Sequence, residues 1–267
     1  MKQNNNFPVL LTFDVDAETL WTARDPEMIN RPIALSQGHY GTKVGLDRVL
    51  RLLARHGIEA TFFVPGQVIE RNEPLMRRIL EAGHEIGHHS YSHKWLDDIS
   101  PQEERMEMEK GYRIIEKLTG APPKGYRSPA GEFTPQTFDL LLEFGFAYSS
   151  NFFDDESPYK HIVKGRKTDL VELPFAWALD DAPFFLYSNR LVGRVMAGPS
   201  AVLETWKREF QVMYAESGCY VLAMHPQIIG RGSRITILEE LIEFIKKHPR
   251  ARFSRCDRFV ESVADKL

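Results

Sequence analysis

The sequence contains only two cysteines, Cys219 and Cys256, among 267 residues. So few cysteines exclude a disulfide framework and a cysteine-rich zinc module, and they fit a reducing compartment. No segment approaches the ~20 apolar residues that a membrane helix requires. Residues 1–6 are polar and lack the apolar core of a signal peptide. We therefore expect a cytoplasmic protein with no membrane partner.

The chain also lacks an excess of charge of either sign. Lys and Arg number 34 and Asp and Glu number 37, which gives a formal net charge of −3. Without a strong positive field, nucleic acid is not an expected partner. Three common catalytic patterns are missing as well: a glycine-rich phosphate loop, H-E-x-x-H and G-x-S-x-G. The chemistry must therefore come from other groups of residues.

Short apolar runs alternate with segments of helical periodicity along the whole chain. We predict strands at 8–13, 59–64, 84–88, 169–173, 219–225 and 252–254, and helices between them. Capping boxes at Ser100 and Thr236 predict two of the helix starts. Such alternation predicts a parallel sheet covered by helices, in one domain over residues 1–267, as either a barrel or an open doubly wound sheet. The long segments 18–40 and 149–167 look irregular and are expected to be active-site loops.

Polar side chains follow several predicted strands, where the site of an α/β fold usually lies. His89 and His93 are four residues apart, which would place both imidazoles on one face of a helical turn. Asp14 and Asp16 end the first strand. Two histidines and one carboxylate are a common site for Zn²⁺ or a similar divalent metal. Because neighbouring like charges favour a division of labour, we assign Asp16 to the metal and Asp14 to the role of general base.

Two further polar residues fit this chemistry. Arg127 can hold a carboxylate with two hydrogen bonds and keep it ionised. His225 ends a strongly apolar strand, where packing does not require an ionisable group. An imidazole there could donate a proton to a leaving amine near neutral pH.

Four sequence motifs, in this order, resemble those of the polysaccharide deacetylase family (carbohydrate esterase family 4, the NodB-homology domain). They are TFDVD at 12–16, HSYSH at 89–93, RSPAG at 127–131 and LAMH at 222–225. The resemblance implies a distorted (β/α) barrel with about seven parallel strands and one divalent metal ion, usually zinc. It also implies hydrolysis of an amide, most often the N-acetyl group of an amino sugar.

The resemblance further implies a role for each matching residue. Asp14 would be the catalytic base, Arg127 the residue that orients it, and His225 the catalytic acid, while the metal ligands would be Asp16, His89 and His93. Either Asp154 or Asp155 would be the carboxylate that tunes the acid. Substrate contacts are expected from Tyr91, Pro129, Trp21 and Asp155, with a backbone N–H near Tyr91 holding the oxyanion.

The first motif departs from the family pattern of two adjacent aspartates followed by glycine, because Val15 separates Asp14 from Asp16. This feature and residues 226–234 resemble a branch with cyclic imidases, allantoinase-type enzymes and peptidoglycan-deacetylase-like proteins. We therefore expect a small soluble amide or cyclic imide as substrate. An N-acetylated sugar, peptidoglycan or chito-oligosaccharide is the alternative.

Aromatic residues in the two long segments could close over a ligand or pack the interface of a homo-oligomer, a dimer or tetramer. A module that binds a glycan without cleaving it is a further alternative. The presence of both a base and an acid candidate argues against it.

Overall fold

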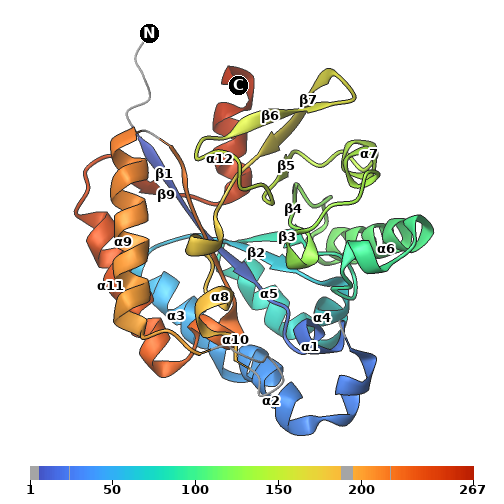
Figure 1. The fold of residues 1–267 in the computed structure, drawn as a ribbon, viewed down its shortest axis with the longest axis horizontal. Helices are drawn as coiled ribbons and strands as arrows, with labels where there is room; N and C mark the ends of the chain where they lie inside the picture. Colours follow the sequence, from blue (N-terminus) through green and yellow to red (C-terminus); the bar gives the residue numbers. More distant parts are fainter. Residues whose placement is uncertain (1–5, 24, 188–194, 217) are drawn as a thin grey trace.

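The computed structural model describes residues 6–23, 25–187, 195–216 and 218–267. The polar residues 1–5, on which the expectation about a signal peptide depends, lie outside this part. The sheet has nine strands, in the order β6-β7-β5-β4-β3-β2-β1-β8, and β9 pairs with β1 (Figure 1). The strands are β1 (Phe7–Asp14), β2 (Thr61–Val64), β3 (Glu85–His88), β4 (Gly125–Tyr126), β5 (Tyr148–Ser149), β6 (Tyr159–Val163), β7 (Arg166–Glu172), β8 (Tyr220–Met224) and β9 (Ala251–Phe253).

Every pair of neighbouring strands is parallel except β6 and β7. The segment after β7 makes a single parallel bridge from Asp180 to Ala223 of β8. This bridge links the two ends of the curved sheet. The predicted distorted (β/α) barrel with about seven parallel strands is therefore confirmed, with β1 to β5, β7 and β8 as its strands.

Helices surround the sheet, as Figure 1 shows. They are α1 (Thr19–Thr22), α2 (Pro32–Tyr40), α3 (Leu46–His56), α4 (Gly66–Arg71), α5 (Glu73–Glu81), α6 (Pro101–Thr119), α7 (Thr137–Glu143), α8 (Ala182–Phe185), α9 (Pro199–Glu216), α10 (Pro226–Ile229), α11 (Gly232–Lys246) and α12 (Cys256–Val263). None of those in the described part of the chain is long and apolar enough to cross a lipid bilayer.

The central strand β1 is apolar along nearly its whole length because both of its faces are covered. Seven of its eight residues are buried. Phe13 stacks on Phe62 of β2 with ring centroids 4.9 Å apart. Trp206 of α9 and Leu241 of α11 belong to the same buried cluster. Continuous apolar runs of this kind are typical of parallel strands that are buried on both faces.

Of the two helix starts predicted from capping boxes, one is confirmed and the other is wrong. The Ser100 side chain accepts a hydrogen bond from the Glu103 N–H and caps α6, as predicted. The capping box at Thr236 is wrong, because α11 begins four residues earlier at Gly232 and the Thr236 hydroxyl donates to the Ser233 carbonyl. The predicted loops are also more regular than expected: segment 18–40 contains α1 and α2, and segment 149–167 contains β6.

A buried carboxyl group at the start of β3 fastens the C-terminal helix to the sheet. Glu85 accepts hydrogen bonds from the Thr61 hydroxyl at 2.6 Å, the Tyr148 hydroxyl at 2.8 Å and the Asp257 N–H of α12 at 3.1 Å. Burial, and then the nearby Asp257 carboxylate, raise the pKa of Glu85 from its ordinary value near 4.5 to about 7. The folded protein therefore binds a proton here more tightly than the unfolded chain does.

We expect Glu85→Gln to remove part of the pH dependence of stability. Between pH 4.5 and 7 the folded state holds the Glu85 proton and the unfolded chain has lost it, so the free energy of unfolding falls as pH rises through this window. Glutamine does not titrate and should lose that fall. Urea unfolding below, within and above the window measures it, with the exposed Glu81→Gln as control. An identical pH dependence in Glu85→Gln and wild type would contradict the assignment.

Candidate active site

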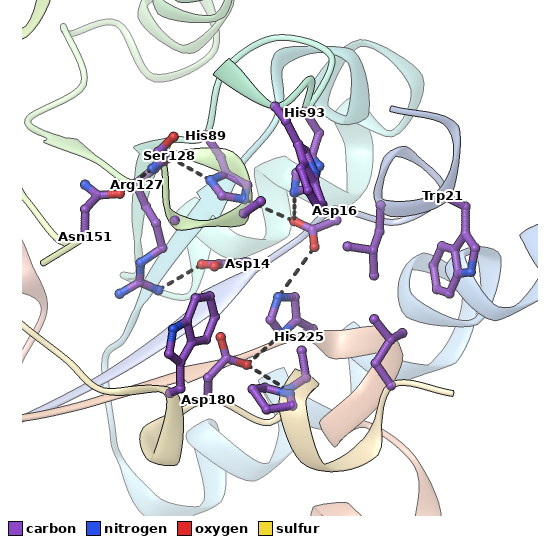
Figure 2. A pocket seen from close by; sticks show the side chains of 18 of the residues that line it. Asp14, Asp16, Trp21, His89, His93, Arg127, Ser128, Asn151, Asp180 and His225 are labelled. Carbon is purple, nitrogen blue, oxygen red and sulfur yellow. Dashed lines mark hydrogen bonds and ion pairs between the residues drawn. The ribbon is translucent and has the colours of Figure 1, made fainter. Parts of the chain in front are cut away.

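The ends of several strands open on one cavity of about 770 Å³ (Figure 2). Asp14 is the last residue of β1, and His225 directly follows β8. All six residues predicted as catalytic groups or metal ligands line this cavity: Asp14, Asp16, His89, His93, Arg127 and His225. These six residues come from segments that lie far apart in the sequence, and the barrel topology brings them together.

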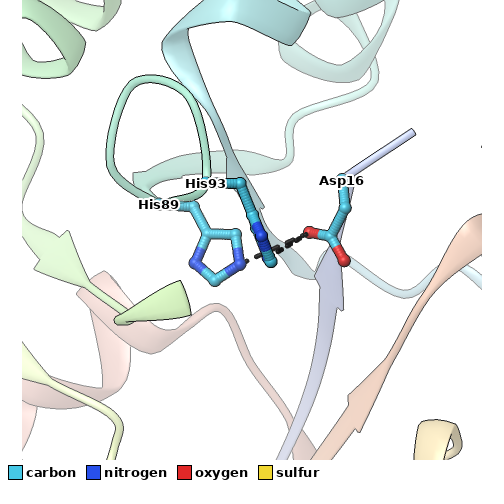
Figure 3. Close-up of side chains that lie close together, drawn as sticks. All are labelled: Asp16, His89 and His93. Carbon is cyan, nitrogen blue, oxygen red and sulfur yellow. Dashed lines mark ion pairs between the residues drawn. The ribbon is translucent and has the colours of Figure 1, made fainter. Parts of the chain in front are cut away.

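Asp16, His89 and His93 form a compact, fully buried group (Figure 3). Asp16 Oδ1 lies 3.3 Å from His89 Nε2 and 3.6 Å from His93 Nε2. One ligand atom from each residue falls within 4.8 Å of the others. Asp16 Oδ1 has no hydrogen-bond partner among the described residues, although it is buried. Because an unsatisfied buried carboxylate oxygen is unfavourable, this donor set fits a divalent cation.

The protonation states of Asp16, His89 and His93 also suit a divalent cation. His89 Nδ1 lies 2.7 Å from the Arg127 carbonyl oxygen, which only accepts, so Nδ1 carries the hydrogen and Nε2 faces Asp16. Burial lowers the pKa of His93 to about 4 and keeps its imidazole neutral. Burial of Asp16 is outweighed by the facing imidazoles of His93, His89 and His225, which lower the pKa of this carboxyl. Burial of His89 is outweighed in turn by Asp16, which raises its pKa, so a bound cation competes with a proton.

The segment that carries the two histidines is a loop, and the predicted helical turn is wrong. Ser90 and His93 have positive φ angles of 62° and 64°. The buried Glu107 carboxylate of α6 accepts hydrogen bonds from the Ser90 and Ser92 hydroxyls and from the Ser92 N–H, at 2.7–2.9 Å. This tertiary clamp, and not helical periodicity, directs His89 and His93 to the same point.

Arg127 is fixed from several sides. Its Nη1 donates to Asp14 Oδ1 at 2.9 Å and to the Thr12 hydroxyl at 2.7 Å. Its Nε and Nη2 donate to the Ser150 carbonyl and hydroxyl, and its guanidinium lies over the Phe63 ring at 4.4 Å. The predicted pairing with Asp14 is present, through one hydrogen bond to Asp14 where two were expected. The buried guanidinium thus orients the Asp14 carboxylate and places a positive charge beside it.

His225 is held by a carboxylate that sequence reasoning did not identify. Its Nδ1 lies 2.7 Å from Asp181 Oδ1, and its backbone N–H donates to Asp181 Oδ2 at 3.1 Å. Burial of His225 is outweighed mainly by Asp181, so the pKa of the imidazole rises well above its ordinary value. His225 Nε2 faces Asp16 Oδ2 at 3.6 Å, on the cavity side.

The expectation that Asp154 or Asp155 supports His225 is wrong. Both are exposed. Asp154 accepts a hydrogen bond from the Tyr159 hydroxyl, and Asp155 accepts from backbone N–H groups of its own turn. The adjacent pair Asp180 and Asp181 after an apolar segment was the available signal in the sequence, and it resembled the pair at 154–155.

Of the four residues predicted to contact the substrate, one lines the cavity. Trp21 lines the cavity, whereas Tyr91, Pro129 and Asp155 are not among its lining residues in the described chain. The Tyr91 N–H donates a hydrogen bond to Glu107, and the Tyr91 hydroxyl donates one to the exposed Glu70. Neither donor is therefore available to an oxyanion in the cavity. Pro129 is buried beside the wall that its neighbours Ser128 and Ala130 form.

The rest of the wall is largely apolar and aromatic. Segment 18–40 contributes Trp21, Leu20 and Met28. Other wall residues are Trp95, Phe175, Trp177 and Leu186. Of the aromatics of segment 149–167, Phe153 packs on Trp177 with ring centroids 5.0 Å apart. The first long segment thus forms part of the wall directly, and the second mainly supports it.

Comparison with known proteins identifies relatives of this chain. Residues 36–149 match the polysaccharide deacetylase family. Over 265 residues, covering 90% of each protein, the chain is 31% identical to the peptidoglycan deacetylase of Helicobacter pylori. A crystal structure from Mycobacterium smegmatis, described as a polysaccharide deacetylase, is 35% identical with a TM-score of 0.93, covering 100% of this chain and 93% of that one. Puue allantoinase has the same fold, with 23% identity, a TM-score of 0.85 and coverage of 99% and 92%.

Proposed function

Because the chain belongs to the polysaccharide deacetylase family, and is thus a hydrolase of non-peptide carbon–nitrogen bonds, we propose that residues 1–267 form one catalytic domain that opens a cyclic imide or a similar small amide. The observation that supports this proposal most is the shared cavity. It combines a base candidate, Asp14, an acid candidate, His225, and a metal-binding donor set.

Asp16, His89 and His93 would hold the metal ion, with Zn²⁺ as the expected species, because this donor set matches zinc chemistry. When bound, such an ion polarises a carbonyl and lowers the pKa of a nearby water. The other catalytic work falls to the side chains of the chain itself.

Asp14 accepts the proton of the attacking water, and Arg127 orients this carboxylate with a hydrogen bond. As the carbon–nitrogen bond breaks, His225 Nε2 gives its proton to the departing nitrogen. Asp181 stabilises the imidazolium before this transfer and fixes the ring orientation. In a cyclic imide these steps open the ring, and in an N-acetylated sugar they release acetate.

The wall of the cavity supports a small substrate. Its volume of about 770 Å³ falls within the range of small-molecule sites, roughly 300–1,000 Å³. The side chains of Trp21 and Met28 add apolar surface that suits a compact ring and excludes water. The free, buried Cys219 and Cys256 fit a reducing compartment, and we place the enzyme in the cytoplasm. We also propose that the protein forms a homo-oligomer, either a dimer or a tetramer, and light scattering can test this.

Deacetylation of a sugar is the second candidate function. Its support is the 31% identity to a peptidoglycan deacetylase over nearly the whole chain. Both reactions use the same amide chemistry, so the identity of the substrate needs a direct test.

The direct test gives the zinc-loaded protein two sets of substrates. One contains succinimide- and hydantoin-type rings, and the other contains chito-oligosaccharides and N-acetylglucosamine polymers. We expect ring opening to exceed acetate release, in kcat/KM, with both reactions slowed by about 10²- to 10⁴-fold in an Asp14→Asn control. Efficient acetate release without ring opening would overturn the choice of substrate.

A further inference from the structure

Two adjacent aspartates follow the short turn at Trp177–Leu179, and they face His225 in different ways. Asp181 is fully buried and holds the imidazole at 2.7 Å. Asp180 lines the cavity, whereas Asp181 is not among its lining residues in the described chain. In Figure 2 one carboxyl oxygen of Asp180 points toward His225 and the other toward Asp14.

The two oxygens of Asp180 have different surroundings. Oδ1 accepts the Ala182 N–H at 2.7 Å and lies 3.8 Å from His225 Nδ1. The second oxygen makes no hydrogen bond to the described residues. The Asp180 side chain is only 8% exposed, and it lines the cavity. An oxygen in such a place needs a hydrogen-bond donor, and the cavity is where that donor can come from.

This oxygen faces the part of the cavity in which the scissile bond is expected to lie. The base Asp14 and the acid His225 must flank the amide that they cleave, and Asp180 lines the same cavity beside both of them. Burial, together with the charges of Asp181 and Asp14, outweighs the opposing charge of His225 and raises the pKa of Asp180 to about 7. A neighbouring N–H group relieves the same crowding of negative charge and leaves the carboxylate ionised.

We propose that Asp180 is a substrate-binding residue that accepts a hydrogen bond from the N–H of the scissile amide. This inference rests on the proposed function and adds a requirement to it: the enzyme selects amides that carry a hydrogen on nitrogen. Cyclic imides and N-acetylated sugars share that feature. During cleavage His225 supplies one proton to the departing nitrogen, and the original hydrogen stays on that nitrogen, hydrogen-bonded to Asp180. The nitrogen becomes the NH2 group of the ring-opened amide, or the amine of a deacetylated sugar.

Succinimide and N-methylsuccinimide form a matched pair for the test, because they differ only in the N–H. Asp180→Asn keeps the shape of the side chain and the bond from Ala182 but weakens acceptance at the second oxygen. We expect it to lower kcat/KM for succinimide by about 10- to 100-fold, the scale of one hydrogen bond to a charged group. Turnover of N-methylsuccinimide should change little. Asp181→Asn is the matched control, and it should lower kcat for both compounds alike because it acts through His225.

An unchanged ratio between the two compounds in Asp180→Asn would overturn the inference, provided that its zinc content and thermal unfolding match wild type. N-acetylglucosamine oligomers and their N-methylated analogues give a second pair if the enzyme is a deacetylase. If wild type turns over no amide, the proposed function fails on its own. Calorimetric binding of the succinimide pair then tests Asp180: weaker binding of succinimide alone in Asp180→Asn supports the inference, and equal affinities in both proteins overturn it.

Discussion

Asp14→Asn is expected to lower kcat by about 10²- to 10⁴-fold, the usual contribution of general base catalysis. The carboxylate lines the cavity, and a buried guanidinium donates a hydrogen bond to it at 2.9 Å. Asparagine can still accept the hydrogen bond from Arg127, so the fold and the cavity should persist. It cannot take a proton from water, so the loss should fall on the chemical step.

Single-turnover kinetics with the zinc-loaded variant measures this loss without interference from product release. Metal content and thermal unfolding should match wild type, and the exposed Asp97→Asn should leave turnover unchanged. Unimpaired chemistry in Asp14→Asn would remove Asp14 from its role and leave the cavity without an identified base.

His93→Ala is expected to abolish stoichiometric metal binding and, with it, turnover. It removes one of three donors that converge within 4.8 Å, and the remaining pair leaves the ion with too few protein ligands. Loss of an outer-sphere partner alone weakens metal binding by about 10- to 100-fold, and loss of a ligand should exceed that.

Competition with a chromophoric chelator gives the zinc affinity of each variant, and mass spectrometry of the dialysed protein gives the stoichiometry. His39→Ala is a suitable control, because that imidazole is exposed and pairs with a carboxylate outside the donor set. Full metal content and normal turnover in His93→Ala would show that the ligand assignment is wrong.

Much of this site was predictable because strand ends are predictable. The continuous apolar run of β1 ends at Asp14, and the apolar β8 leads into His225. In a parallel barrel these ends meet at one edge, so the shared cavity follows from the pattern of the strands. The way in which side chains are arranged around these strand ends is harder to predict from the sequence.

The conformation of the loop at 89–93 shows this limit. A spacing of four residues suggested a helical turn, but Ser90 has a φ of 62°, which no local preference of serine favours. The Glu107 carboxylate, 17 residues away from Ser90, supplies the hydrogen bonds that hold the loop. A tertiary contact of this kind leaves no periodic pattern.

The carboxylate that holds His225 was not predicted, for a related reason. Asp181 lies 44 residues before the histidine, and only the bridge that closes the barrel brings them together. Two aspartates at 154–155 look the same in sequence as the pair at 180–181. Burial separates the two pairs, and burial depends on the completed sheet.

The most direct test of the central claim is a zinc titration of the metal-free protein while amide hydrolysis is followed. We expect the rate of succinimide opening or acetate release to rise with added Zn²⁺ and to reach its plateau at one equivalent per chain. Asp14→Asn should bind the same equivalent without the rate. Hydrolysis at full rate in the metal-free protein, or a plateau reached without occupancy of Asp16, His89 and His93, would contradict the central claim.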